Sequence, residues 1–303
     1  MKRSNWIYIL GCLLIFGLFA LGSGSANDSS VQKASSVKSD ESGATSEEST
    51  KESSNSNQAT IDEQVLYDDN DIKITATSLE DSLFGTDLKV LIENNSSQNI
   101  TVQARNANIN GYMVSTMMSD DVASGKKANG ELTFETSGLK DCGIEQIGTI
   151  EFIFHIFDSD SWDEIVDSDV ITVKTSLADT FEQNYDDSGD VLVDSHDVRI
   201  IAKGLSKADS FWGPGVILYI ENNSDKDVTI QVRDVSVNGF MVESSMSSDV
   251  IAGKKAISDV QFFSSDLEKN GIEDINDVEF YFHIFDMNSL DEIYDSEVIN
   301  MSF

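Results

Sequence analysis

The sequence predicts an all-β fold with two tandem β-sandwiches, and four observations carry this prediction. The heptapeptide at residues 152–158 returns at residues 280–286, an offset of 280 − 152 = 128, so one module is written twice. Each copy contains short segments in which apolar and polar residues alternate, which is typical of strands. Neither copy contains a long segment with helical spacing. Each copy also has the size of one sandwich domain, about 100 residues.

The N-terminal segment, residues 1–26, predicts export from the cytoplasm. Lys2 and Arg3 give it a positive start, an apolar run follows over residues 6–21, and small residues lead up to Ala26. A positive start, an apolar centre and a small-residue end are the three parts of a cleavable signal peptide. We therefore expect cleavage after Ala26.

Two alternatives for this segment stay open. Residues 6–25 are nearly long enough to remain as a membrane anchor, and Cys12 lies in a short lipobox-like sequence that could carry lipid. All three fates place the rest of the chain on the extracellular side of the cell envelope. Residues 27–62 are rich in Ser, Glu, Lys and Asn with few large apolar residues, which predicts a disordered stalk.

The first repeat, residues 63–176, predicts a series of short strands. Residues 72–76 and 100–105 alternate between apolar and polar side chains, and residues 88–92 form an apolar run. Asn110-Gly111 predicts a two-residue hairpin turn, because both residues tolerate positive φ. We expect further strands at residues 128–134, 152–157 and 170–173, and a helical turn at residues 137–140.

The second repeat, residues 191–303, follows a short acidic linker at residues 177–190. It differs in length from the first repeat by two residues inserted between Leu205 and Val216, where a turn between strands tolerates an insertion. About seven strands in each copy predict two immunoglobulin-like antiparallel β-sandwiches. A small barrel is the alternative.

The net charge of −34 excludes one class of partner. Residues 65–176 carry 7 basic and 20 acidic side chains, and residues 191–303 carry 8 and 21, so each repeat has a charge of −13. Binding to nucleic acid relies on Lys and Arg that displace counterions from phosphates, so nucleic acid is not expected as a partner. We expect contact with a membrane through the N-terminal segment alone.

The repeated heptapeptide has two faces when it forms a strand. Apolar residues on both faces predict a strand in the middle of a sheet, with the face of Phe152, Phe154 and Ile156 toward the core. The opposite face holds a histidine between two apolar residues. We predict that this face is a contact surface in both repeats, formed by Ile153, His155 and Phe157 and by Tyr281, His283 and Phe285.

The acidic segment after the heptapeptide is a candidate site for Ca²⁺, which prefers oxygen ligands. It lacks the glycine that an EF-hand loop requires at its sixth position, and a solvated acidic turn is the alternative interpretation. No other cofactor is expected. The candidate metal ligands are Asp158, Asp160 and Asp163 in the first repeat and Asp286, Asn288 and Asp291 in the second.

Catalysis is not predicted. Cys12 and Cys142 are the two cysteines, neither repeat has a pair, and Cys142 is expected in a loop as an incidental small residue. His196 is not shared by the two copies, because it aligns with Asn70. No pairing of a nucleophile with a base recurs in both repeats, which disfavours an envelope hydrolase.

A set of motifs carries a resemblance to a known family. The pattern IENNS, TVQ, NGYMV, GKK and FHIFD, repeated as IENNS, TIQ, NGFMV, GKK and FHIFD, resembles the uncharacterised immunoglobulin-like modules of secreted proteins and lipoproteins in Gram-positive bacteria. These modules are related in fold to a secreted mycobacterial immunoprotective antigen. The resemblance implies an extracellular β-sandwich, and it brings no established activity or catalytic residue.

These observations lead to one functional hypothesis and two alternatives. We expect a non-catalytic, secreted or surface protein whose tandem sandwiches serve as binding or spacer units on a flexible stalk, with a ligand in the envelope or outside the cell. The first alternative is a Ca²⁺-dependent adhesion or sensor module that uses the acidic segments. The second is an envelope hydrolase.

Overall fold

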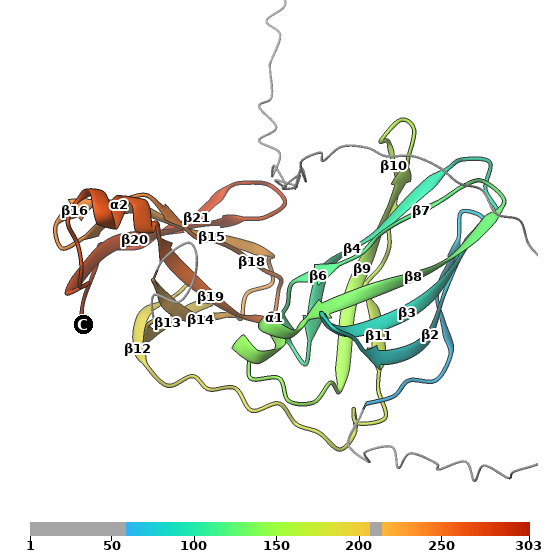
Figure 1. The fold of residues 1–303 in the computed structure, drawn as a ribbon, viewed down its shortest axis with the longest axis horizontal. Helices are drawn as coiled ribbons and strands as arrows, with labels where there is room; N and C mark the ends of the chain where they lie inside the picture. Colours follow the sequence, from blue (N-terminus) through green and yellow to red (C-terminus); the bar gives the residue numbers. More distant parts are fainter. Residues whose placement is uncertain (1–58, 207–213) are drawn as a thin grey trace, which may run out of the picture. The chain divides into compact units, whose positions relative to one another are not determined.

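The computed structural model describes residues 59–206 and 214–303 (Figure 1). The predicted signal or anchor at residues 1–26 and the predicted stalk up to residue 58 lie outside the described residues, as does most of the predicted insertion loop. The described part is an all-β fold, as predicted. Its helices are all too short or too polar to cross a membrane.

One sheet belongs wholly to the first repeat. It has five antiparallel strands in the order β1-β2-β3-β8-β6. Strand β3 pairs along its full length with β8, so the centre of this sheet is regular. Its strands are β1 (Gln64–Asp69), β2 (Ile72–Asp81), β3 (Gly85–Asn94), β6 (Thr116–Met117) and β8 (Lys126–Glu135).

A second sheet contains strands from both repeats. The first repeat contributes β4 (Ile100–Ile109), β5 (Tyr112–Met113), β7 (Ser119–Val122), β9 (Thr149–Asp158), β10 (Glu164–Asp167) and β11 (Ile171–Lys174). The second contributes β12 (Asp190–Ser195), β13 (Val198–Leu205), β14 (Gly215–Asn222), β17 (Ser244–Ser245) and β19 (Lys255–Phe262). The two groups meet at a single parallel pairing, Lys255 with Tyr112.

The third sheet belongs to the second repeat and is antiparallel. Its six strands are β15 (Val228–Val237), β16 (Phe240–Met241), β18 (Ser247–Val250), β20 (Asp277–Asp286), β21 (Glu292–Asp295) and β22 (Ile299–Ser302). A short helix follows the same strand in each repeat. These helices are α1 (Thr136–Asp141), where the helical turn was predicted, and α2 (Ser264–Lys269).

Each repeat has its own hydrophobic core, built from two sheets. In the first repeat Ile74 of β2 and Phe154 of β9 belong to one buried cluster, and in the second Leu218 of β14 and Phe282 of β20 belong to another. Strand β9 lies between β4 on one side and β10 and β11 on the other. The prediction of a central strand is therefore confirmed, and so is the prediction that Phe152, Phe154 and Ile156 face the core.

Two kinds of turn fix the register of the strands in both repeats. The predicted hairpin turn is confirmed, because Asn110 and Gly111 have φ values of 50° and 86°. Asn94 is fully buried, and its side-chain nitrogen donates to the carbonyl oxygens of Gln98 and Val122 at 2.8 and 2.9 Å. Asn222 makes the same pair of bonds in the second repeat. The buried amide thus ties the turn after β3 to the end of β7.

The structure has more strands than the sequence predicts. Strands β6, β7 and β10 come from segments that were expected to be loops. Each is two to four residues long, too short to show a clear period in the sequence. Strand β10 is the important addition, because it lies inside the predicted acidic loop.

Cys142 is not incidental, contrary to the prediction. It caps α1 at its C-terminus, is buried, and packs in a small cluster with Tyr112 of its own repeat and Ile201 and Tyr219 of the second repeat. The linker joins the same region, because the Tyr185 hydroxyl donates to the carbonyl oxygen of Asn110 at 2.6 Å. Position 142 therefore packs where the repeats meet.

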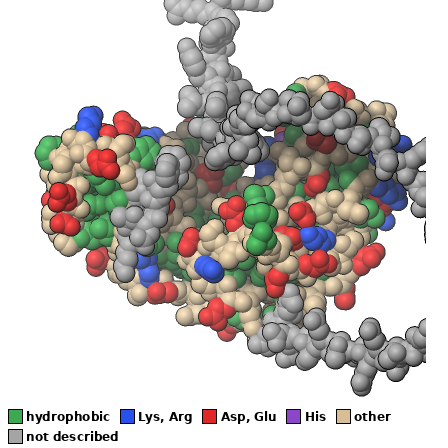
Figure 2. Space-filling model, in the orientation of Figure 1, with side chains coloured by type: hydrophobic (Ala, Val, Ile, Leu, Met, Phe, Trp, Pro, Cys, Tyr) green, Lys and Arg blue, Asp and Glu red, His purple; other side chains and the backbone are tan. Residues whose placement is uncertain are grey.

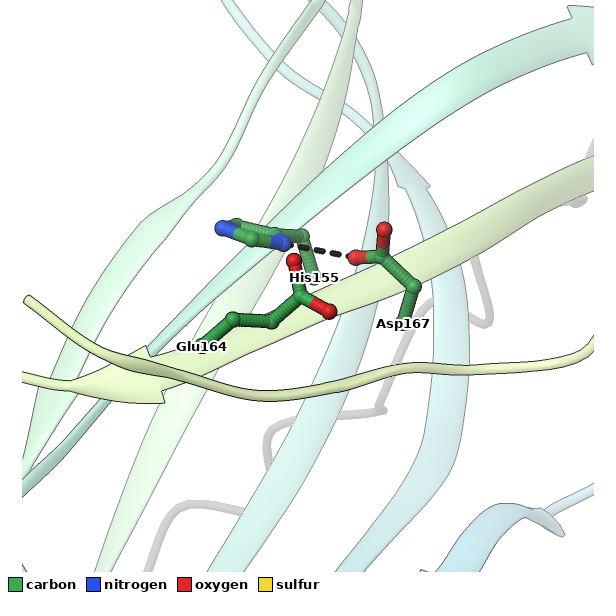
Figure 3. A group of neighbouring side chains, drawn as sticks. All are labelled: His155, Glu164 and Asp167. Carbon is green, nitrogen blue, oxygen red and sulfur yellow. Dashed lines mark hydrogen bonds and ion pairs between the residues drawn. The ribbon is translucent and has the colours of Figure 1, made fainter. Parts of the chain in front are cut away.

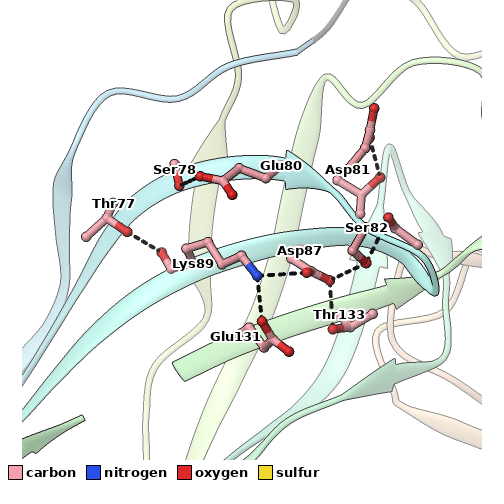
Figure 4. A network of polar contacts seen from close by, with 11 residues as sticks. Thr77, Ser78, Glu80, Asp81, Ser82, Asp87, Lys89, Glu131 and Thr133 are labelled. Carbon is pink, nitrogen blue, oxygen red and sulfur yellow. Dashed lines mark hydrogen bonds and ion pairs between the residues drawn. The ribbon is translucent and has the colours of Figure 1, made fainter. Parts of the chain in front are cut away.

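A polar network joins β3 and β8 in the first repeat (Figure 4). The Asp87 carboxylate is 3% exposed and accepts hydrogen bonds from Lys89, Thr133 and Ser82 at 2.8, 2.8 and 3.1 Å. Lys89 also donates to Glu131 at 2.5 Å. Burial acts to raise the pKa of Asp87, but the hydrogen bonds from Lys89, Thr133 and Ser82 outweigh it, so the pKa is lowered overall.

Candidate functional site

The candidate site of the first repeat lies where β10 returns along β9. Asp167 is the strand partner of His155, and Glu164 is the partner of Phe157. A β-bulge between Glu164 and Val166 makes this register possible. Without the extra residue, Val166 would face His155 and Asp167 would point toward the core. The bulge therefore gathers His155, Glu164 and Asp167 on the outer face.

The second repeat builds the same site with the same irregularity. Asp295 is the strand partner of His283, Glu292 is the partner of Phe285, and the extra residue at the break in register is Ile293 of β21. The His-to-Asp spacing is twelve residues in both repeats. The site is thus a property of the module rather than of one copy.

The three side chains of the first site lie close together (Figure 3), and those of the second do the same. The distance from His155 Nδ1 to Asp167 Oδ1 is 2.6 Å, and the distance from His283 Nδ1 to Asp295 Oδ1 is also 2.6 Å. In each trio one atom from the imidazole and one from each carboxylate lie within 4.8 Å of one another. We call these trios the histidine–carboxylate clusters: His155, Glu164 and Asp167 in the first repeat, and His283, Glu292 and Asp295 in the second.

Aromatic neighbours hold each imidazole from one side. The ring centroids of His155 and Phe157 are 5.3 Å apart, as are those of His283 and Phe285. In the first repeat Trp162 stacks on Phe157 at 5.6 Å. The side chain of His155 is 10% exposed and that of His283 is 25% exposed. The imidazole in each cluster is therefore oriented by packing as well as by its aspartate.

The carboxylates of the clusters are exposed and form no ion pair with a Lys or Arg of the described chain. The side chains of Glu164 and Glu292 make no hydrogen bond or ion pair with any described residue. The histidine is the one partner of Asp167 and of Asp295 among the described residues. On the face seen in Figure 2, acidic side chains are spread among apolar and uncharged ones. Each cluster thus concentrates uncompensated negative charge next to an imidazole, an arrangement that suits a bound cation.

The carboxylates predicted as Ca²⁺ ligands do not converge on one point in the described part of the chain. Asp158 instead caps the turn, because its Oδ1 accepts from the backbone N–H groups of Asp160 and Ser161 at 2.8 and 2.9 Å. These N–H groups, that of Ser161 first, lower the pKa of Asp158. Asp160 accepts from the Asn99 amide at 3.0 Å, and Asp163 is exposed.

The corresponding residues of the second repeat behave in the same way. Asp286 accepts from the backbone N–H groups of Asn288 and Ser289 at 2.9 and 3.0 Å, and those groups, that of Ser289 first, lower its pKa. The side chains of Asn288 and Asp291 are exposed. The turn is therefore stabilised by hydrogen bonds from its own backbone.

The predicted contact surface is more covered than expected. His155 and Phe157 are 8% and 6% exposed, and Ile153 is half-buried. In the second repeat all three residues, Tyr281, His283 and Phe285, are half-buried. On the same outer face the side chains of Asp167 and Asp295 are 41% and 43% exposed.

The sequence did not lead us to pair the histidines with carboxylates. The available signal was that a histidine on a strand is followed twelve residues later by aspartate in both copies, across a turn. That spacing predicts a His–Asp pair across a hairpin only if residues 164–167 are already known to form a strand that contains a bulge. A four-residue strand rich in acidic residues gives neither indication.

The comparisons with known proteins assign no family to this chain. No protein-family model and no curated protein matches it. A solved structure of the YadV chaperone aligns with 77% of this chain and 100% of its own chain at 11% identity, with a TM-score of 0.24. At that TM-score the likeness carries no argument about fold or function.

Proposed function

We propose that this chain is a non-catalytic protein of the extracellular side of the cell envelope, and that its two repeats are immunoglobulin-like β-sandwiches that act as tandem binding units. The N-terminal segment would export or anchor the chain, and residues 27–62 would form its stalk. The proposal agrees with the resemblance to modules of secreted Gram-positive proteins. The all-β fold and the separate core of each repeat support it.

The observation that carries the binding role is the duplicated histidine–carboxylate cluster. A spacer requires only hydrophobic cores and a joint between the repeats, so the same histidine–carboxylate trio in both copies favours a binding role. Both clusters keep the His-to-Asp distance of 2.6 Å although the residues around them differ, such as Trp162 in one repeat and Leu290 in the other. Two equal sites on one stalk also suit bivalent binding, which raises overall affinity without new contacts.

A binding role fits the chemistry of the described residues better than catalysis does. Burial raises the pKa of the Cys142 thiol to about 11, so it is not a thiolate at neutral pH. His155 and His283 each contact an aspartate, but no hydroxyl or thiol nucleophile contacts either imidazole in the described chain. A triad needs a nucleophile within hydrogen-bond reach of its base.

A spacer role is the second candidate, and the joint between the repeats favours it. Lys255 donates its backbone N–H to the carbonyl oxygen of Gly111 at 2.9 Å, and its ammonium lies 4.5 Å from the centre of the Tyr185 ring. Lys254 forms an ion pair with Glu151. Contacts of this kind restrict motion at the joint, which a spacer needs.

The binding proposal is tested by site-specific crosslinking on intact cells. The full chain is expressed in a Gram-positive host with a photoreactive amino acid in place of Tyr281, and in a matched control in place of Lys126, which is exposed. Protease added to intact cells should digest the repeats. Light should produce one discrete adduct from position 281 and none from position 126. Protection from protease, or the same adducts from both positions, would contradict the proposal.

A further inference from the structure

We propose that each histidine–carboxylate cluster binds one divalent transition-metal ion, and that Zn²⁺ is the ion its ligands fit best. The ligands are His155, Glu164 and Asp167 in the first repeat and His283, Glu292 and Asp295 in the second. The inference deepens the proposed function, on which it rests, by assigning an ion to the same two sites. It also replaces Ca²⁺ at the turn with a different metal at a neighbouring place.

The ligand types select the class of metal. An imidazole nitrogen with two carboxylates is a mixed N and O set, which suits Zn²⁺ and its neighbours among the first-row divalent ions. Ca²⁺ prefers six to eight oxygen ligands, and imidazole is not among them. The clusters therefore discriminate against the ion that the acidic sequence first suggests.

The geometry needs a small adjustment, and the residues that must move are free to do so. Zn²⁺ binds N and O ligands at about 2.0–2.1 Å, so tetrahedral ligand atoms lie roughly 3.4 Å apart. The three atoms of each cluster lie within 4.8 Å of one another, and the 2.6 Å hydrogen bond between the imidazole and its aspartate would lengthen by about 0.8 Å as the ion enters. Glu164 and Asp167 are exposed and can rotate, whereas His155 is buried and stays oriented by Phe157.

Comparison of the two copies shows that the proposed ligands are the same in both and that several residues around them differ. Several positions around the clusters have changed between the repeats, including Trp162 to Leu290 and Val166 to Tyr294. All three ligand types and the register break in the hairpin are the same in both copies. A solvated acidic turn would require neither the histidine nor the bulge that aims an aspartate at it.

The charge around each cluster attracts a cation. The four carboxylates of the two clusters have no Lys or Arg partner in the described chain, on a protein of net charge −34. Three protein ligands leave at least one position for water or for a donor group of a partner. A metal held in this way would give the outer face a specific point of attachment.

Isothermal titration of the full chain in mild detergent with ZnCl₂, after treatment with a chelator, measures the number of sites. We expect two ions per chain, one in His155→Ala, one in His283→Ala, and none in the double variant. The matched control is Asp163→Asn with Asp291→Asn. It removes two carboxylate charges from exposed turn positions outside the clusters, the same number that Glu164→Gln with Glu292→Gln removes inside them. This control should keep two sites, and CaCl₂ should not compete.

A second variant is needed because His155 is buried, so that misfolding alone can abolish Zn²⁺ binding in His155→Ala. Glu164→Gln with Glu292→Gln changes exposed side chains without described partners, so it should leave the melting temperature unchanged and weaken Zn²⁺ binding at least about tenfold. Equal binding by the Gln variant and the wild type would overturn the metal assignment. The proposed function would survive that result if the crosslink from position 281 persisted in the Gln variant and in the presence of chelator.

Discussion

Both repeats contain a histidine–carboxylate cluster. They differ in the polar contacts that stabilise their sheets and in the residues that pair with their Gly-Lys-Lys segments. Both present a histidine 2.6 Å from an aspartate. The network around Asp87 and Lys89 exists in the first repeat alone, because Gly215 and Ile217 occupy the matching positions of the second. The difference shows that the cluster is the same in both copies while the polar contacts that stabilise each repeat differ.

The Gly-Lys-Lys segment shows the same divergence. In the first repeat Lys127 forms an ion pair with Glu93 of its own repeat. In the second repeat Lys254 pairs with Glu151 of the first repeat, and Lys255 lies over Tyr185 of the linker. One sequence motif thus stabilises a single repeat in one copy and joins two repeats in the other.

The largest expected effect is the loss of stability when a core phenylalanine is removed. It tests whether the two cores contribute equally to the free energy of unfolding. Phe154→Ala and Phe282→Ala each remove a fully buried ring from the core face of the repeated strand. Each should lower the free energy of unfolding by about 3–5 kcal/mol, through lost burial and the cavity that remains. Urea denaturation measures both. Thr172→Ala, at an exposed strand position, serves as the control. A loss below about 1 kcal/mol in either Phe variant would break the equivalence of the cores.

The second prediction concerns the network of the first repeat. Lys89→Met leaves Asp87 buried without its cation and should lower the free energy of unfolding by about 1–3 kcal/mol, less than for a fully buried pair because Lys89 is partly exposed. Lys126→Met, on an exposed side chain with no described ion pair, should change it by less than about 0.5 kcal/mol. Denaturation midpoints measure both changes. An equal change of midpoint in Lys89→Met and Lys126→Met would show that the network does not stabilise the repeat.

The third prediction uses pH. The folded-state pKa values of Asp158 and Asp286 are lowered, so their contribution to stability is complete above the unfolded value of about 3.9 and is lost as the pH falls through the folded value. Asp158→Asn and Asp286→Asn should each narrow the gap between the urea midpoints at pH 7 and pH 3.

Salt should separate these two variants. Asp286 pairs with Lys226 at 3.2 Å, whereas Asp158 accepts from the neutral Gln98 amide at 2.8 Å. Added NaCl screens an exposed ion pair more than a neutral hydrogen bond. It should therefore reduce the effect of Asp286→Asn and leave that of Asp158→Asn. An identical salt response would show that the Lys226 pair contributes nothing.

The smallest expected effect concerns the cover over the histidine. Trp162→Leu makes the first repeat match the second at this position and removes a stacked ring that is 76% exposed. The free energy of unfolding should fall by less than about 1 kcal/mol. Zn²⁺ affinity at the first cluster should move toward that of the second. A loss of binding would mean that Trp162, rather than the hairpin, organises the cluster.

The sequence predicts the core well because the core follows simple periods. Phe152, Phe154 and Ile156 share one face of a strand whose other face carries a histidine, and Asn110-Gly111 has the chemistry of its turn, so both predictions are confirmed. The cluster escapes prediction because it depends on one extra residue in a four-residue strand. A bulge reverses the faces of every residue after it and leaves no mark in the period of so short a segment.

Histidine NMR tests the central claim most directly, because the chain has three histidines and one lies outside the clusters. His196 is exposed, and its ring contacts Ser195 and Tyr294 without a carboxylate partner among the described residues. In ¹H–¹⁵N spectra of the imidazoles, Zn²⁺ should shift the signals of His155 and His283 until two equivalents are bound and leave His196 unchanged. Equal shifts of all three histidines, or no shift of the cluster pair, would contradict the account.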